Sequence, residues 1–135
     1  MLEQLNKTHI GLLDSKIDEE NCSLVINTID KLQDYDIGEH SAVYGLFNSA
    51  TNELVGFIDI GEYKDGLIIN NMVVFQGHKR KGYGRTLIKQ SLKGEFDKNY
   101  HSCLYADVLY DKEIGFYERL GFENVEDYLY VKTLI

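Results

Sequence analysis

The sequence predicts an α+β fold of three layers (α/β/α), in which a mixed, mostly antiparallel sheet of six to seven strands has helices on both faces. Three observations predict it. Apolar residues in residues 16–35 recur at the spacing of a helix face, whereas from residue 41 the period changes to that of strands. Residues 67–109 then follow the order strand, helix, strand. That order implies a right-handed crossover between two parallel strands of one sheet.

The N-terminal third supplies a short strand and two helices. We expect the strand at residues 2–5, a short helix at residues 8–15 and a longer helix within residues 16–35. Residues spaced i, i+3, i+7 and i+10 share one side of a helix. In the longer helix this apolar face is formed by Cys22, Val25, Ile29 and Leu32, with Ile26 at its edge.

Three strands follow as an antiparallel meander. Ser41–Phe47 and residues 54–60 flank a polar loop at residues 48–52, as in a hairpin. A third strand, residues 67–75, comes directly after Lys64-Asp65-Gly66, in which Asp-Gly is a strong signal for a tight turn.

The C-terminal half alternates helices and strands. We expect a helix over residues 84–100 and an internal strand over residues 102–109. Asp111 can serve as the N-cap of a second, short helix, and Gly121 is suited to the C′ position that ends it. The last strands are expected at residues 122–125 and 129–134.

Composition limits the classes of protein to consider. A chain of 135 residues with 44% hydrophobic and 27% charged residues is typical of a globular protein, so we expect one domain over residues 1–135. No apolar run approaches the ~18 residues of a membrane span, and the N-terminus lacks the features of a secretion signal. Cys22 and Cys103 are expected as reduced thiols in a cytoplasmic protein. The net charge of −8 argues against nucleic-acid binding, so we expect neither nucleic acid nor a membrane as partner.

A basic, glycine-rich turn follows the third meander strand. Basic residues at 78–81 precede Gly82 and Gly84, after which a helical pattern begins. The N-terminus of a helix presents unpaired backbone N–H groups and a positive dipole, which favour an anion. The turn fits neither a dinucleotide-binding fingerprint, because Leu87 replaces the third glycine, nor a P-loop, because Tyr83-Gly84 replaces the Lys and hydroxyl residue. It therefore predicts a phosphate group at residues 79–85.

Two motifs together resemble those of one family. Lys79-Arg80-Lys81-Gly82-Tyr83-Gly84 resembles the Gln/Arg-x-x-Gly-x-Gly/Ala turn of the GNAT N-acetyltransferase superfamily. Residues 114–122 resemble the second signature of that family, a helix ending in F-Y-x-x-L-G-F. The resemblance covers roughly residues 41–135. It implies acetyl-CoA as cosubstrate, no metal, and direct transfer of the acetyl group to a primary amine in a ternary complex. The acceptor implied is a small molecule or a peptide. The loop before the last strand, which helps to shape the acceptor site in this family, is short here (residues 126–128) and suggests a cleft that is open or completed in a homodimer.

The resemblance also implies roles for individual residues. Backbone N–H groups of the turn bind the pyrophosphate, the N–H of Val74 polarises the thioester carbonyl, and Tyr117 protonates the leaving CoA thiolate. The expected catalytic residues are Tyr117 and Val74. The expected cofactor-binding residues are Met72, Val73, Val74, Lys79, Arg80, Lys81, Gly82, Tyr83, Gly84, Arg85 and Tyr110.

Three positions depart from the family pattern. Lys79 stands where Gln or Arg is usual, Tyr110 where Asn is frequent, and Ile68 where some members carry a general-base Glu. An amine with a pKa of ~10.4 costs roughly 4–5 kcal/mol to deprotonate at pH 7, which the site must supply through desolvation, a base or an ordered water chain; an amine of lower pKa needs less help. The alternative hypothesis is a non-catalytic CoA-binding or interaction module on the same fold. Candidate bases are Asp59, Glu62, His101 and Asp107.

Overall fold

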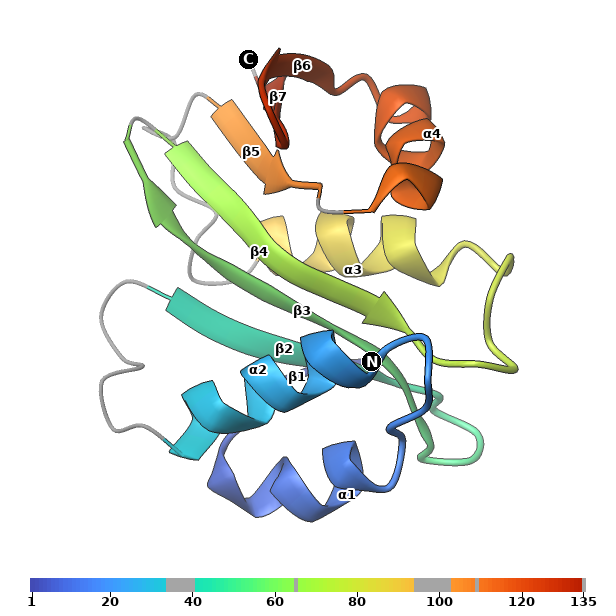
Figure 1. Ribbon diagram of the computed structural model, residues 1–135. Coiled ribbons are helices and arrows are strands. Elements are labelled where there is room, and N and C mark those ends of the chain that lie inside the picture. The colour runs from blue at the N-terminus through green and yellow to red at the C-terminus, as the bar shows by residue number, and fades with distance from the viewer. Residues whose placement is uncertain (34–40, 65, 94–102, 109, 135) are drawn as a thin grey trace.

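A single seven-stranded mixed sheet forms the centre of the molecule, and helices cover both of its faces (Figure 1). The computed structural model describes residues 1–33, 41–64, 66–93, 103–108 and 110–134. The strand order is β1-β2-β3-β4-β5-β7-β6. The strands are β1 (Leu2–Gln4), β2 (Ser41–Phe47), β3 (Leu54–Tyr63), β4 (Gly66–Val74), β5 (Cys103–Asp107), β6 (Glu123–Glu126) and β7 (Leu129–Thr133). The helices are η1 (Lys7–His9), α1 (Ile10–Asp14), α2 (Cys22–Gln33), α3 (Tyr83–Leu92) and α4 (Asp111–Arg119).

The sheet separates two hydrophobic cores. On one face, α1 and α2 pack on the sheet through residues such as Leu13 and Val25, together with Phe57 of β3. On the other face, Leu87 of α3 and Ile58 of β3 belong to the second core. Adjacent residues of β3 thus point into different cores, as strand alternation requires. β3 is therefore a central strand buried on both sides, and the predicted three-layer fold is confirmed.

The topology also confirms the predicted strand pairing. β2, β3 and β4 form an antiparallel meander, and β4 pairs in parallel with β5 after the crossover through α3. The predicted turn between β3 and β4 includes Asp65, which lies outside the described residues. None of the helices in the described ranges combines the length and the apolar character that a membrane crossing requires.

A β-bulge divides β4 into two halves. Asp59 and Ile60 of β3 pair with Asn71 and Ile69, which leaves Asn70 as an extra residue on β4. β4 pairs with β5 only up to Ile69. Because a bulge bends its strand, the second half of β4 diverges from β5. This divergence opens the sheet at the carboxyl end of a central strand.

The long N-terminal helix lies within the predicted range. α2 runs from Cys22 to Gln33, inside residues 16–35, and begins at the first residue of the predicted apolar face. The carboxylate of Asp18 accepts hydrogen bonds from the backbone N–H groups of Glu20 (2.9 Å) and Asn21 (2.8 Å). A side chain that accepts from neighbouring backbone N–H groups in this way competes with a helix, so a turn at residues 19–21 precedes α2.

The predicted boundaries of the second half need two corrections. The helix expected over residues 84–100 runs from Tyr83 to Leu92, and residues 94–102 lie outside the described residues. Asp111 is not the N-cap of α4. Tyr110 holds that position in an extended conformation, and Asp111 opens the first turn, where a carboxylate still interacts favourably with the helix dipole. Gly121 has a φ of 97° and follows the C-cap, as predicted.

Candidate active site

A cleft of about 640 Å³ lies where β4 and β5 diverge. Its walls come from the end of β4, the following turn, the N-terminus of α3, the first turns of α4 and the segment before α2. All of the predicted cofactor-binding residues except Lys81 line this cleft, and Lys81 is exposed instead. The turn at residues 79–84, the motif at residues 114–122 and the end of β4 therefore meet at one cleft.

The N-terminus of α3 offers unpaired backbone donors to the cleft. Gly82 is the N-cap, in the left-handed region at φ 81°, and no side chain caps the helix. The first backbone bond within the helix runs from the N–H of Thr86 to the oxygen of Gly82 (3.1 Å). The N–H groups of residues 83–85 thus have no partner within the helix. This arrangement fits an anionic group of the cosubstrate.

The two glycines of the turn are required for different reasons. A Cβ on Gly82 would meet nothing within 4 Å, so its role is the left-handed backbone that a side chain disfavours. A Cβ on Gly84 would lie 3.0 Å from Cζ of Phe116. Gly84 therefore allows α3 to pack closely against α4, which brings both helices to the cleft.

The backbone at the end of β4 faces two directions. The carbonyl oxygen of Val73 points at β3, since a Cβ added to Gly56 would lie 2.5 Å from it, and the N–H of Phe75 donates to Val55 on the same strand (2.9 Å). Backbone groups alternate sides along a strand. The N–H and C=O of Val74 hence point away from β3, toward the open side where β4 and β5 diverge. That orientation fits the predicted hydrogen bond to a thioester carbonyl.

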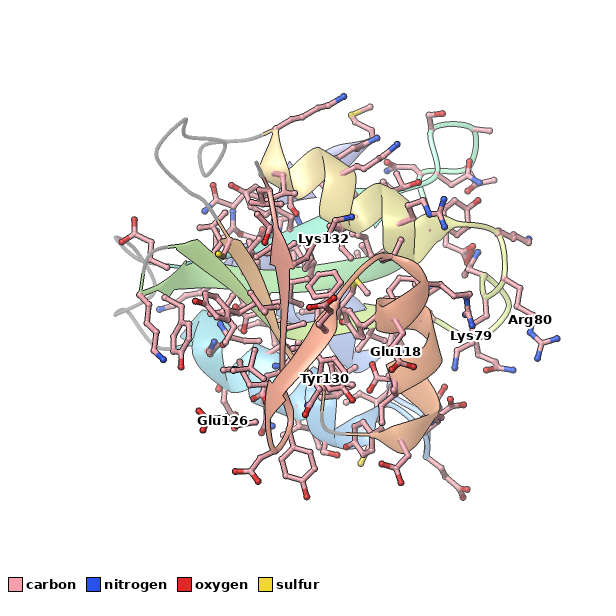
Figure 2. All side chains as sticks on the ribbon, turned by 90° about the horizontal axis from the view of Figure 1, so that it is seen from above. Lys79, Arg80, Glu118, Glu126, Tyr130 and Lys132 are labelled. Carbon is pink, nitrogen blue, oxygen red and sulfur yellow. The ribbon has the colours of Figure 1, made fainter. Side chains whose placement is uncertain are left out.

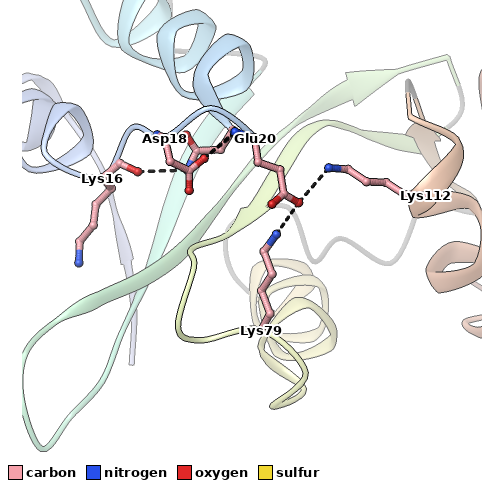
Figure 3. A network of polar contacts seen from close by, with 6 residues as sticks. Lys16, Asp18, Glu20, Lys79 and Lys112 are labelled. Carbon is pink, nitrogen blue, oxygen red and sulfur yellow. Dashed lines mark hydrogen bonds and ion pairs between the residues drawn. The ribbon is translucent and has the colours of Figure 1, made fainter.

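A carboxylate bridges two lysines across the cleft (Figure 3). Oε1 of Glu20, in the turn before α2, accepts from Nζ of Lys79 at 2.7 Å and from Nζ of Lys112 at 2.8 Å. Hydrogen bonds from Lys112 and Lys79 lower the pKa of Glu20 to about 2. The bond to Glu20 in turn raises the pKa of Lys112. Neither Glu20 nor Lys112 was among the predicted site residues.

The turn between β4 and α3 is anchored on a second side as well. Nε2 of His78 lies 3.0 Å from Oε1 of Glu53, which also pairs with Lys16 at 3.3 Å. The next basic residues of the turn, Lys79 and Arg80, lie beside each other at one edge of the molecule (Figure 2). The turn is thus positioned by side chains from other elements, while Lys79 and Arg80 line the cleft.

Tyr110 connects the beginning of α4 with the beginning of α2. Its hydroxyl lies 3.3 Å from Oγ of Ser23, and Nζ of Lys112 lies 5.8 Å from the centroid of its ring. The short Asn side chain that the family pattern favours here is replaced by one long enough to reach Ser23 of α2. Tyr110 lines the cleft as predicted.

Tyr117 lies deeper than the other predicted residues. It is 2% exposed, and its ring packs edge-on against Phe116 (centroids 5.1 Å apart) and Phe122 (5.3 Å). The backbone of Tyr117 also accepts from the N–H of Phe122 (3.1 Å), in a Schellman closure of α4. Tyr117 lines not the large cleft but a small cavity of about 10 Å³. The walls that the two cavities share are Leu24, Met72, Tyr110 and Glu113.

The environment of Tyr117 makes its phenol a weaker acid than the sequence suggested. Burial raises the pKa of Tyr117 well above its usual range, and the nearby charge of Glu113 raises it further. A higher pKa keeps the phenol protonated at neutral pH. It also makes proton transfer to a thiolate less favourable than the unperturbed pKa of ~10 implied.

The candidate bases differ in how they are placed. Asp59 is fully buried and pairs with Lys31 through Oδ2 (2.6 Å), lining neither cavity, and Glu62 is exposed beyond the site. Asp107 lines the small cavity, and His101 lies outside the described residues.

Glu113 is better placed than these candidates, although the sequence reasoning missed it. It lines both cavities, and burial raises its pKa. Its position four residues before Tyr117 on a helix was the signal that could have revealed it. The cleft residues that were not predicted are Asp18, Glu20, Asn21, Leu24, Gln76, Lys112, Glu113, Phe116 and Arg119.

Comparison with known proteins agrees with this geometry. The family model described as an acetyltransferase (GNAT) domain matches residues 39–124. The chain belongs to the GNAT acetyltransferase family. No curated protein sequence matches the chain.

Solved structures of GNAT proteins share the fold. An acetyltransferase from Thermus thermophilus superposes with a TM-score of 0.80 at 19% identity, over 99% of this chain and 97% of that one. The PaiA N-acetyltransferase from Thermoplasma acidophilum, solved with coenzyme A, gives a TM-score of 0.70 at 15% identity, over 97% and 95% of the two chains. A further similar structure is an AtaT–AtaR complex bound to DNA (TM-score 0.74, 16% identity, 98% and 93%).

Proposed function

We propose that this GNAT protein is an N-acetyltransferase that transfers the acetyl group of acetyl-CoA to a primary amine by direct attack in a ternary complex. One observation carries the proposal. The large cleft joins the uncapped N-terminus of α3 to the free edge of β4, and its inner end shares Glu113 and three further lining residues with the small cavity of buried Tyr117. These are the three parts that binding of a phosphorylated thioester, polarisation of its carbonyl and protonation of its leaving group require.

The outer part of the cleft is suited to the phosphates of acetyl-CoA. The unpaired N–H groups of residues 83–85 act with the side chains of Lys79, Arg80 and Arg85, which line the same wall. The pantetheine arm then lies along the second half of β4 and forms hydrogen bonds with it like an added strand. In this arrangement the N–H of Val74 donates to the thioester carbonyl and stabilises the negative charge that develops on its oxygen.

Proton transfer is assigned to the inner part of the cleft. Tyr117 donates its phenolic proton to the CoA thiolate as the carbon–sulfur bond breaks. The attacking amine must be neutral, and Glu113 is our candidate for the base that removes its proton, because this carboxyl group lines both cavities. Its raised pKa brings it closer to the working pH of a general base.

The acceptor and the cellular setting belong to the same proposal. We propose a small molecule or a peptide as the source of the amine, in the cytoplasm. Since one structural relative is part of a DNA-bound complex, the expectation that this protein has no nucleic-acid partner stays a prediction, as does the homodimer.

Thermal unfolding with about 1 mM acetyl-CoA, CoA or ATP tests the cosubstrate. A ligand with a Kd near 10 μM adds about 2.7 kcal/mol at that concentration, a shift of several degrees in Tm. We expect acetyl-CoA and CoA to raise Tm and ATP to leave it unchanged. The absence of a shift with acetyl-CoA would contradict the proposal.

A non-catalytic CoA-binding module is the second candidate. It is favoured by the position of Tyr117 outside the large cleft, together with its raised pKa. A panel of amines, assayed for release of CoA from acetyl-CoA, separates the two. Turnover with any amine supports the enzyme, and binding of acetyl-CoA without turnover of any amine in the panel supports the module.

A further inference from the structure

We infer that Lys79 and Lys112 form a subsite for a phosphate group of the acyl-CoA, and that the carboxylate of Glu20 occupies this subsite as a built-in competitor. The inference rests on acetyl-CoA being the cosubstrate, as proposed above. It adds Glu20, a residue outside both family motifs, as a determinant of the affinity for the phosphates. The subsite would also make the protein prefer thioesters that carry phosphate groups over thioesters that lack them.

The position of the Glu20 carboxylate is the first argument. One oxygen, Oε1, accepts from both lysines at 2.7 and 2.8 Å, a geometry that a phosphate oxygen also adopts between two ammonium groups. Lys79 comes from the turn that precedes α3, and Lys112 from the first turn of α4. All three residues line the large cleft. Figure 3 shows Glu20 reaching from the α2 side to both lysines.

The segment that carries Glu20 is held in place before any ligand arrives. Asp18 accepts from the backbone N–H groups of Glu20 and Asn21, the backbone N–H of Asp18 donates to the side chain of Asn21 (2.9 Å), and the Asn21 amide donates to the carbonyl of Lys16 (3.1 Å). These bonds fix the backbone of the segment. The Glu20 carboxylate therefore loses little conformational entropy when it pairs with the two lysines. Glu19, the preceding residue, is exposed and forms no ion pair among the described residues.

Charge is the second argument. The cleft is also lined by Arg80, Arg85 and Arg119, and no ion pair to these arginines occurs within the described residues. In a chain with a net charge of −8, this concentration of cations marks an anion site. Glu20 neutralises part of it. The phosphate groups of CoA together carry more charge and more acceptor oxygens than one carboxylate, so they displace Glu20 readily.

The exchange makes phosphate groups necessary for tight binding. Exposed ion pairs are individually weak and cost little to break, so acetyl-CoA incurs only a modest penalty when it releases Glu20. A thioester without phosphates, such as S-acetylpantetheine, has no anionic group to pair with the lysines, so the ion pairs of Glu20 with Lys79 and Lys112 stay in place.

Binding measurements on matched variants test the inference. We compare the wild type with Glu20→Gln, Lys112→Gln and the control Glu19→Gln, which removes the same charge from the adjacent position. Calorimetry gives the Kd of acetyl-CoA, and titration of Tm measures the weaker S-acetylpantetheine. We expect Glu20→Gln to bind acetyl-CoA about 3–10-fold more tightly and Lys112→Gln about 3–10-fold more weakly, with Glu19→Gln within about 2-fold of the wild type. S-acetylpantetheine should gain nothing from Glu20→Gln.

The outcomes separate this inference from the proposed function. Weaker acetyl-CoA binding by Glu20→Gln, or an effect equal to that of Glu19→Gln, overturns the competitor role while leaving the cosubstrate intact. An equal gain for S-acetylpantetheine overturns the phosphate subsite. Failure of the wild type to bind acetyl-CoA instead removes the proposed function itself. Since Glu20 and Lys112 are exposed side chains, we expect both variants to fold, and their Tm values without ligand check this.

Discussion

The outer and inner ends of the cleft place their titratable groups in opposite surroundings. At the outer end, Glu20 is exposed between Lys79 and Lys112, which lower its pKa to about 2. At the inner end, burial raises the pKa of Glu113, which lines the cleft, and that of Tyr117 in the adjoining small cavity. Interactions between exposed charges are screened by salt over about 8 Å at physiological ionic strength, whereas desolvation is not. For the proposed enzyme we therefore expect separate control of the two ends, with acetyl-CoA binding sensitive to salt and the chemical step sensitive to packing and pH.

The largest expected effect belongs to the inner end. Tyr117→Phe removes the proposed acid but keeps the ring that packs against Phe116 and Phe122, so we expect kcat to fall about 10–10³-fold while the Kd of acetyl-CoA and Tm change little. Steady-state kinetics with an amine identified in the panel, combined with calorimetry, measures both. Tyr130→Phe is the control, because it removes a hydroxyl from another buried tyrosine that lines neither cavity. An unchanged kcat would remove Tyr117 from the mechanism.

Glu113→Gln should come next in size. If this carboxylate accepts the proton of the amine, kcat/KM falls about 10–10²-fold in the variant. In the wild type kcat/KM should rise with pH as Glu113 deprotonates. The pH profile of the variant should lack this rise. A pH profile of the variant that keeps the shape of the wild type would exclude Glu113 as the base.

The same variant has a second readout in stability. Because the folded state raises the pKa of Glu113, it binds the proton more tightly than the unfolded chain does, and stability falls as pH rises from the ordinary pKa of 4.5 through the raised pKa. Gln carries no charge and avoids this loss. We therefore expect the difference in Tm between the variant and the wild type (variant minus wild type) to be larger at pH 7 than at pH 4.

At the outer end, the backbone of the turn should matter more than its single charges. Gly82→Ala places a side chain at φ 81°, which costs roughly 1 kcal/mol or distorts the turn, and we expect the affinity for acetyl-CoA to fall about 5–10-fold. Calorimetry measures the loss. Gly11→Ala, in α1 and with open space around the new Cβ, is the matched control. Equal affinities of the two variants would show that the turn does not hold the phosphates.

The smallest effect is expected for stability at Glu20. Its lowered pKa favours the folded state above pH 4.5, and that contribution is lost as pH falls from 4.5 to about 2. Since the group is fully exposed, screening leaves little of it, and we expect Glu20→Gln to change Tm at pH 7 by no more than about 2 °C. Differential scanning calorimetry in low and physiological salt measures this. A larger drop would mean that the bridge to the lysines is a structural element.

Local features could be predicted from the sequence, whereas contacts between distant segments could not. The turn at residues 79–84 and the helix end at Gly121 could be predicted, because turns and helix ends depend on residues that are neighbours in the sequence. The helix within residues 16–35 was also predicted, because its apolar residues recur along one helix face. Glu20 is 59 residues from Lys79 and 92 from Lys112. No local pattern reveals such a pairing.

The bulge at Asn70 has a consequence for how such a cleft can originate. Asn70 is the extra residue between two stretches of regular pairing with β3. Its deletion would leave those pairs in register, and we expect it to let β4 continue beside β5 and close the sheet over the space that the cleft occupies. A single extra residue in a central strand is then enough to open a binding site, a change that one insertion in the gene can make and one deletion can reverse.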